Sequence, residues 1–108
     1  MQDWATLSPF QHEFIRKNSR PVFYGPFSLR KVKKAPFLGF AVVVPVKVSK
    51  KAVIRNNIRR RVKAIFTENK PFLEKSPFIV FVKEDITELS PDELKKAVIS
   101  LFKKAYIL

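Results

Sequence analysis

The sequence predicts an α/β (α+β) sandwich, with helices packed on one central sheet in the order α-β-β-α-β-α. Two short β-branched apolar runs, at 37–46 and 78–82, are typical of buried strands. Amphipathic stretches that follow capping or basic residues, at 8–17, 51–69 and from 90 onward, are typical of helices. With 108 residues, 46% of them hydrophobic, the chain can bury one modest core. We therefore predict a single domain over residues 1–108.

Charge indicates the class of partner. The net charge is +13, and fifteen of the 22 lysines and arginines lie between Phe14 and Thr67, where there is no acid. Such a polycation should bind nucleic acid with strong salt dependence or be attracted to anionic membranes. No apolar run approaches the ~20 residues of a membrane span, and no signal peptide precedes the domain, so we expect no membrane partner. The absence of cysteine excludes disulfides and thiolate chemistry.

The first helix is predicted from Ser8, a plausible N-cap, to about Lys17, with Gln11 completing a capping box. Phe10 and Phe14 lie one turn apart on it. They are either ordinary core residues or partly exposed aromatics that line a groove. The single histidine, at position 12, is expected on the surface side and simply solvated.

The next segment, 18–26, holds two prolines and a glycine and is predicted to be a turn or an irregular strand entry. Alternation follows it. Phe27 and Leu29 point one way, and Ser28 and Arg30 the other, which predicts a half-buried strand whose polar side could face RNA.

The run at 37–46 predicts a central strand covered on both faces, with regular pairing ending or bulging near Pro45. A basic loop at 47–51 leads into the helix predicted from about Lys51 to near Asn69, before Pro71. The run at 78–82 predicts another buried strand.

The helix at 51–69 has two faces. An apolar stripe recurs at three- and four-residue steps: Ile54, Ile58, Val62 and Ile65, with Phe66 beside them. A cationic face lies next to it: Arg55, Arg59 and Lys63, widened by Asn56 and Arg60. One side can anchor in a core while the other binds a polyanion, although a merely solvated basic face is the alternative.

The closing helix has the clearest local signal in the chain. Ser90 is predicted as N-cap, Pro91 as first helical residue and Glu93 as box partner, while Leu89 and Leu94 can form a hydrophobic staple. Its apolar face is predicted to comprise Leu94, Ala97, Val98, Leu101, Phe102 and Ala105.

Catalytic chemistry is weakly represented. Glu84, Asp85 and Glu88 cluster in a loop, but turns collect acids anyway, so they are a weak metal candidate. Two glycines in the whole chain leave no Gly-rich phosphate loop. Cations, amides and aromatics remain, and these side chains bind phosphates, 2′-OH groups and unpaired bases.

The stretch AVIRNNIRRR resembles the signature of the bacterial ribonuclease P protein component. The positions that match it are Ala52, Val53, Ile54, Arg55, Asn56, Ile58, Arg59 and Arg60. The resemblance extends to Phe10-Gln11 and Phe14, Phe27 and Leu29, Leu38-Gly39, the FIVFV strand and the capped last helix. The chain departs from the family at Asn57, where the family usually has arginine, and at Arg30, where an aromatic is expected. The segment between Gly39 and Ala52 is also longer than in the family, and the family's Ser-Lys-Lys has no single clear counterpart in it. It resembles a divergent member.

The resemblance implies a left-handed βαβ crossover, which the general handedness rule would not predict. It also implies a protein subunit that aids 5′ maturation of precursor tRNA in the cytoplasm, while the catalytic ribonuclease P RNA performs the cleavage. Mg²⁺ would be held mainly by the RNA and the substrate, with no catalytic or metal residue in the protein.

Two binding sites are implied. One takes the 5′ leader in a groove between the first helix and the sheet, with candidates Phe10, Phe14, Ser28 and Arg30. The other takes the catalytic RNA, with candidates Lys47, Lys50, Lys51, Arg55, Asn56, Arg59, Arg60 and Lys63. A structural RNA-binding protein, for example of the ribosome, is the alternative function. DNA is not an expected partner, because the chain has no helix-turn-helix spacing.

Overall fold

The computed structural model describes residues 7–32, 39–68 and 77–107. Its elements run in the order α1 (Pro9–Lys17), β1 (Val22–Tyr24), β2 (Phe27–Lys31), β3 (Phe40–Val43), α2 (Ala52–Glu68), β4 (Phe78–Val82) and α4 (Pro91–Ile107). The predicted class, helices packed on one central sheet, is confirmed, as is the predicted order of the longer elements.

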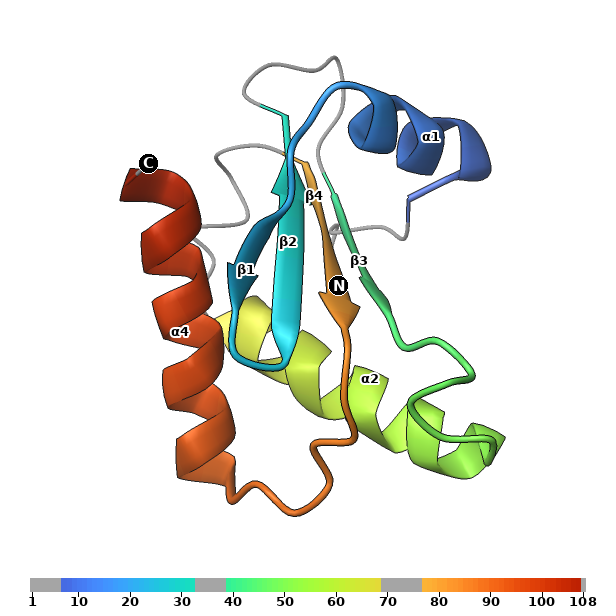
Figure 1. Ribbon diagram of the computed structural model, residues 1–108, viewed down its shortest axis with the longest axis vertical. Helices are drawn as coiled ribbons and strands as arrows, with labels where there is room; N and C mark the ends of the chain where they lie inside the picture. The colour runs from blue at the N-terminus through green and yellow to red at the C-terminus, as the bar shows by residue number, and fades with distance from the viewer. Residues whose placement is uncertain (1–6, 33–38, 69–76, 108) are drawn as a thin grey trace.

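The four strands form one mixed sheet in the order β1-β2-β4-β3. β2 pairs antiparallel with β1 and with β4, whereas β3 and β4 are parallel and joined through α2. Figure 1 shows β3 and β4 both running downward, with β4 to the left of β3 and α2 behind the sheet. This arrangement is a left-handed crossover, as the family resemblance implied.

α2 and α4 pack on one face of the sheet and form the main core with it. Four phenylalanine rings hold this core together. Phe66 of α2 meets Phe78 edge to face at 5.3 Å and Phe102 of α4 at 4.8 Å, while Phe40 stacks on Phe78 at 5.4 Å. These contacts tie two helices and two strands into one unit.

α1 covers part of the opposite face, at the upper end of the sheet in Figure 1. A second, smaller core lies beneath it, formed by Leu7, Ile15, Val32, Ala41 and Ile79. Because α1 is short, the rest of this face has no helix over it in the part of the chain that the structure describes.

The segment predicted to be a turn or an irregular strand entry contains the three-residue strand β1. β1 and β2 are joined by a two-residue turn in which Gly25 has φ +56° and Pro26 follows. A positive φ at the first turn residue matches the twist of a hairpin and favours glycine. The strand predicted at 37–46 is regular only over Phe40–Val43, before Pro45 as expected, and its first two residues lie outside the described ranges. Its predicted central place is wrong, because β3 pairs with β4 alone and lies at an edge of the described sheet.

The predicted helix boundaries are close to those observed. Ser8 caps α1 through a complete capping box with Gln11. α2 ends at Glu68, one residue before the predicted end. Ser90 and Glu93 exchange the two hydrogen bonds of a second box, at 2.9 and 3.1 Å. Leu94 is buried in the main core, and Leu89 is partly buried and packs against that core.

Candidate nucleic-acid interface

An open groove of about 490 Å³ lies on the sheet face that α1 only partly covers. Side chains from α1 and from every strand line it: His12, Arg16, Pro21, Phe23, Ser28, Arg30, Val43 and Phe81. The groove is therefore built by the packing of the first helix on the sheet.

The floor of the groove is one row of paired residues across all four strands. Phe23 pairs with Ser28, Ser28 with Phe81, and Phe81 with Val43. Residues paired across a sheet point to the same face, so the four side chains form a continuous strip. The strip places one aromatic ring on each side of the small Ser28 hydroxyl, and such a surface is suited to binding unstacked bases.

Cations border the groove on the side of α1. Arg16 is exposed, and Arg30 is held in place because its guanidinium donates to the Ser19 carbonyl at 2.9 Å. Among the residues that the structure describes, no acid lines this groove. A phosphate chain laid along the strip would therefore meet positive charge and no carboxylate.

The four predicted groove residues divide into two pairs. Ser28 and Arg30 line the groove, because strand alternation points them to this face. Phe14 is half-buried and packs against the smaller core, so the core alternative describes it better. Phe10 is 75% exposed and does not line the groove, because α1 points it toward solvent.

Sequence reasoning missed all the other lining residues: His12, Arg16, Pro21, Phe23, Val43 and Phe81. The histidine, expected to be simply solvated, is half-buried at the groove wall. The pairing register carries the signal that could have found three of them. Once Ser28 is assigned to the open face, its partners Phe23 and Phe81, and then Val43, must share that face.

The second candidate surface is formed by α2 and the loop before it. The predicted apolar stripe is the anchored side: Ile58, Val62, Ile65 and Phe66 are buried, and Ile54 packs against them. Asn56 and Arg60 are exposed, and Arg55, Arg59 and Lys63 are half-buried. The helix thus presents its cationic side outward, as its sequence predicted.

Three arginines of α2 have different hydrogen-bond partners. Arg55 donates to the Ser49 carbonyl at 2.9 Å, which fixes the basic loop against the helix. Arg59 donates to the Asn56 side chain on the exposed face. Arg61 donates to the Leu89 carbonyl at 2.7 Å, so it ties α2 to the segment before α4. Arg61 is consequently a structural residue, and it was not among the predicted RNA-binding residues.

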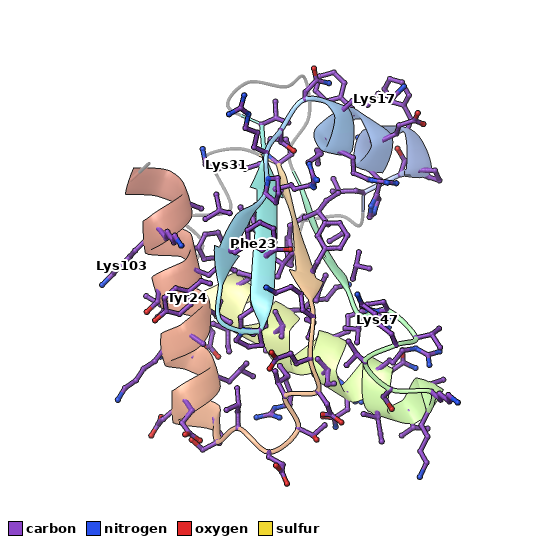
Figure 2. All side chains as sticks on the ribbon, viewed as in Figure 1. Lys17, Phe23, Tyr24, Lys31, Lys47 and Lys103 are labelled. Carbon is purple, nitrogen blue, oxygen red and sulfur yellow. The ribbon has the colours of Figure 1, made fainter. Side chains whose placement is uncertain are left out.

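The loop before α2 begins where the groove ends. Val43 lines the groove, and Lys47 follows it by four residues; Figure 2 shows Lys47 beside the start of α2. Lys47, Lys50 and Lys51 are exposed, as are Val46 at 60% and Val53 at 79%. The basic loop therefore starts near the Val43 end of the groove and leads to α2, which packs on the other face of the sheet.

The acidic loop after β4 does not form a metal centre. Among the described residues, no three histidine, aspartate or glutamate side chains lie close enough to hold a metal ion. Asp85 instead accepts hydrogen bonds from the Thr87 backbone N–H and hydroxyl, at 2.9 and 2.7 Å. These bonds, the backbone one first, lower the pKa of Asp85. In the described ranges, no helix is both long and apolar enough to cross a membrane.

Comparison with known proteins gives one consistent family. The family model described as Ribonuclease P matches residues 8–106. The ribonuclease P protein component of Bacillus velezensis is 36% identical over 64 residues, which are 56% of this chain and 55% of that protein. The chain thus aligns with about half the length of this curated relative.

Solved structures show the same fold. The Staphylococcus aureus RNase P protein superposes with a TM-score of 0.82 at 17% identity and covers 96% of both chains. The Thermotoga maritima RNase P protein superposes with a TM-score of 0.73 at 22% identity, covering 85% of this chain and 88% of that one.

Proposed function

The chain belongs to the ribonuclease P protein family, and from this premise we propose that it is the protein subunit of ribonuclease P, an endoribonuclease. In this role it binds the catalytic RNA and the 5′ leader of precursor tRNA, and so aids the removal of the leader in the cytoplasm. The observation that carries the proposal is the groove. It joins an aromatic strip and a cationic border on one face of the sheet.

The groove suits a single-stranded leader. Phe23 and Phe81 offer ring faces to bases, and Ser28 between them is small enough to let a base approach the sheet. Arg16 and Arg30 can neutralise phosphates along the same strand. None of these contacts requires a base-paired partner, which favours an unpaired RNA segment over a duplex.

The surface formed by α2 and the basic loop suits the catalytic RNA. Its exposed cations, Lys47, Lys50, Lys51 and Arg60, can contact backbone phosphates, and Asn56 can bind 2′-OH groups. The basic loop follows β3, whose last residue, Val43, lines the groove, so an RNA bound to this loop would hold its cleavage site close to the leader.

Catalysis in this proposal belongs to the RNA subunit. Mg²⁺ would be held mainly by the RNA and the substrate and would supply the chemistry of cleavage there. The residues of this chain bind and orient: the groove positions the leader, and α2 positions the protein on the catalytic RNA.

The leader contact is tested by affinity. The protein is assembled with its cognate catalytic RNA, and the dissociation constants for precursor tRNA and for the same tRNA without its leader are compared. We expect the protein to tighten the binding of precursor tRNA more than the binding of leaderless tRNA. If the ratio of the two dissociation constants is the same for the assembled enzyme and for the RNA alone, the protein does not bind the leader.

The alternative, a structural RNA-binding protein of the ribosome, uses the same basic helix. It predicts that the protein co-purifies with ribosomal RNA. The groove argues for the ribonuclease P role, because a protein that only neutralises folded RNA has no need for a strip of partly exposed aromatic side chains.

A further inference from the structure

The segment from Pro45 to Lys51, which contains the basic loop, has a defined structure although three of its residues are exposed lysines. Its first half is a turn in which the Val48 backbone N–H donates to the Pro45 carbonyl at 3.0 Å. The Val48 side chain packs against the main core. Figure 1 shows the chain turning back here, beside the first turn of α2. The lysines are therefore carried by a folded segment.

The second half of the segment is held through Ser49. Its hydroxyl accepts a hydrogen bond from the Lys51 backbone N–H at 3.2 Å. Its carbonyl accepts one from the guanidinium of Arg55 at 2.9 Å. The Lys51 carbonyl in turn accepts the backbone N–H groups of Ile54 and Arg55, both at 3.1 Å, so it belongs to the first turn of α2. Arg55 thus ties the first turn of the helix back to the loop that precedes it.

The residues that are held differ from those that are free to bind. Val48 and Ser49 are half-buried, whereas Lys47 before them and Lys50 and Lys51 after them are exposed. We call these three exposed residues the loop lysines. Fixing the backbone at Val48 and Ser49 sets the directions in which the loop lysines leave the chain.

A fixed loop binds a polyanion better than a loose one with the same charges. The loop lysines repel one another, so an unrestrained loop would spread them over many conformations. Ordering such a loop on binding costs conformational entropy, and a loop that is already ordered avoids part of this cost. The bond from Arg55 to the Ser49 carbonyl is charge-assisted, which makes it stronger than a neutral hydrogen bond.

We propose that Arg55 is a positioning residue for the catalytic RNA: it holds the Ser49 carbonyl and thereby presents the loop lysines together to the RNA phosphates. The inference rests on the proposed function. Its ligand is the phosphate backbone of the catalytic RNA, and Arg55 acts on that ligand through the loop. A direct phosphate contact by Arg55, which its place on the cationic side of α2 would also allow, is the competing role.

A double-mutant cycle separates the two roles. Affinity of the full chain for the cognate catalytic RNA is measured for wild type, for Arg55→Ala, for a variant with all three loop lysines changed to alanine, and for the combination. Low salt keeps binding measurable in every variant. We expect Arg55→Ala to weaken binding about tenfold in the wild-type background. Without the loop lysines the same change should weaken binding less than about twofold, because no cation is left to position.

The salt dependence gives a second readout. A direct phosphate contact by Arg55 would make Arg55→Ala lower the salt slope by about 0.7 to 0.9. A positioning role predicts weaker binding with an unchanged slope, because the loop lysines still neutralise the same phosphates.

Two further variants serve as controls. Arg60→Ala removes an exposed cation of the same helix, so its loss of affinity should be the same with and without the loop lysines. Ser49→Ala loosens the segment without removing any charge. It should weaken binding about threefold in the wild-type background and leave the background without the loop lysines unchanged. It also carries the test if Arg55→Ala does not fold.

Equal losses for Arg55→Ala in both backgrounds would overturn the proposal, since they would mean a direct contact or a damaged fold. Wild-type affinity in both Arg55→Ala and Ser49→Ala would overturn it as well, because the loop would then work without being held. A wild-type protein that binds ribosomal RNA as tightly as the cognate catalytic RNA would instead contradict the proposed function.

Discussion

Phe81 is the residue on which the groove depends most directly. It sits in the row between Ser28 and Val43, and it also packs against the smaller core. Its ring therefore has two roles, one in stability and one in stacking, and two substitutions can separate them.

We expect Phe81→Leu to keep most of the packing and to lose the stacking surface. Leader-dependent affinity should fall about 5- to 100-fold, the range for one base on one aromatic ring, while the unfolding midpoint changes little. Phe81→Ala should lower both. A Phe81→Leu protein with full preference for precursor over leaderless tRNA would show that the ring serves only the core.

Arg60 and Arg61 are neighbours with opposite roles. Arg60 is exposed on the cationic side of α2, whereas Arg61 donates to the Leu89 carbonyl. We expect Arg60→Ala to lower the salt slope of catalytic RNA binding by roughly one and to leave stability unchanged. Arg61→Ala should cost about 2 kcal/mol of unfolding free energy, because a partly buried carbonyl loses a charged donor.

Titration of RNA binding against salt, with urea unfolding in parallel, separates the two arginines. An equal decrease of the salt slope in both variants would contradict the distinction.

The sequence alone predicts that this helix is cationic on one side, since that follows from residue type and period. It does not predict which guanidinium is held by a carbonyl 28 positions away, since such a contact depends on tertiary packing.

Among the elements, the two capped helices differ in one respect. Both begin with a capping box, but the partner residue is Gln11 in α1 and Glu93 in α4. Hydrogen bonds from Ser90, the backbone N–H first, lower the pKa of Glu93 below its ordinary 4.5. Glutamine does not titrate, so only the start of α4 responds to acid.

The lowered pKa of Glu93 determines how the stability of the protein changes with pH. When the folded-state pKa of a carboxylate is lowered, its charge stabilises the fold at every pH above its ordinary pKa. This stabilisation is lost as the pH falls through the lowered, folded-state pKa. We expect Glu93→Gln to unfold at a midpoint that falls less between pH 5 and 3 than that of wild type. Circular dichroism melts across that range measure it, and parallel curves for the two proteins would contradict a role for the Glu93 charge.

Elements with strong local signals were predictable, and the exception has a physical cause. α1, α2 and α4 carry caps or an apolar period, and the boundaries follow from them. β1 has only three residues, two of them exposed, so neither burial nor alternation marks it. It forms because β2 pairs with it across the turn and because α4 packs beside it, and the contact with α4 joins residues 81 positions apart.

At the scale of the whole molecule, layer architecture was predictable from the sequence, but handedness was not. Apolar strands and amphipathic helices require a sheet with helices packed on it. The left-handed crossover from β3 through α2 to β4 runs against the general preference, and only the family resemblance implied it. The candidate site shows the same division: Arg30 and the cations of α2 and its loop were predicted from the sequence, whereas Arg16 was not, and the groove row needs the register of four strands.

The central claim is that this chain assists an RNA catalyst. The most direct measurement is cleavage of precursor tRNA by the cognate catalytic RNA at limiting Mg²⁺, with and without the protein. We predict that adding the protein increases cleavage at the mature 5′ end, because its cations lower the ionic demand of binding the substrate. Cleavage and substrate affinity no greater than with the RNA alone would contradict the account.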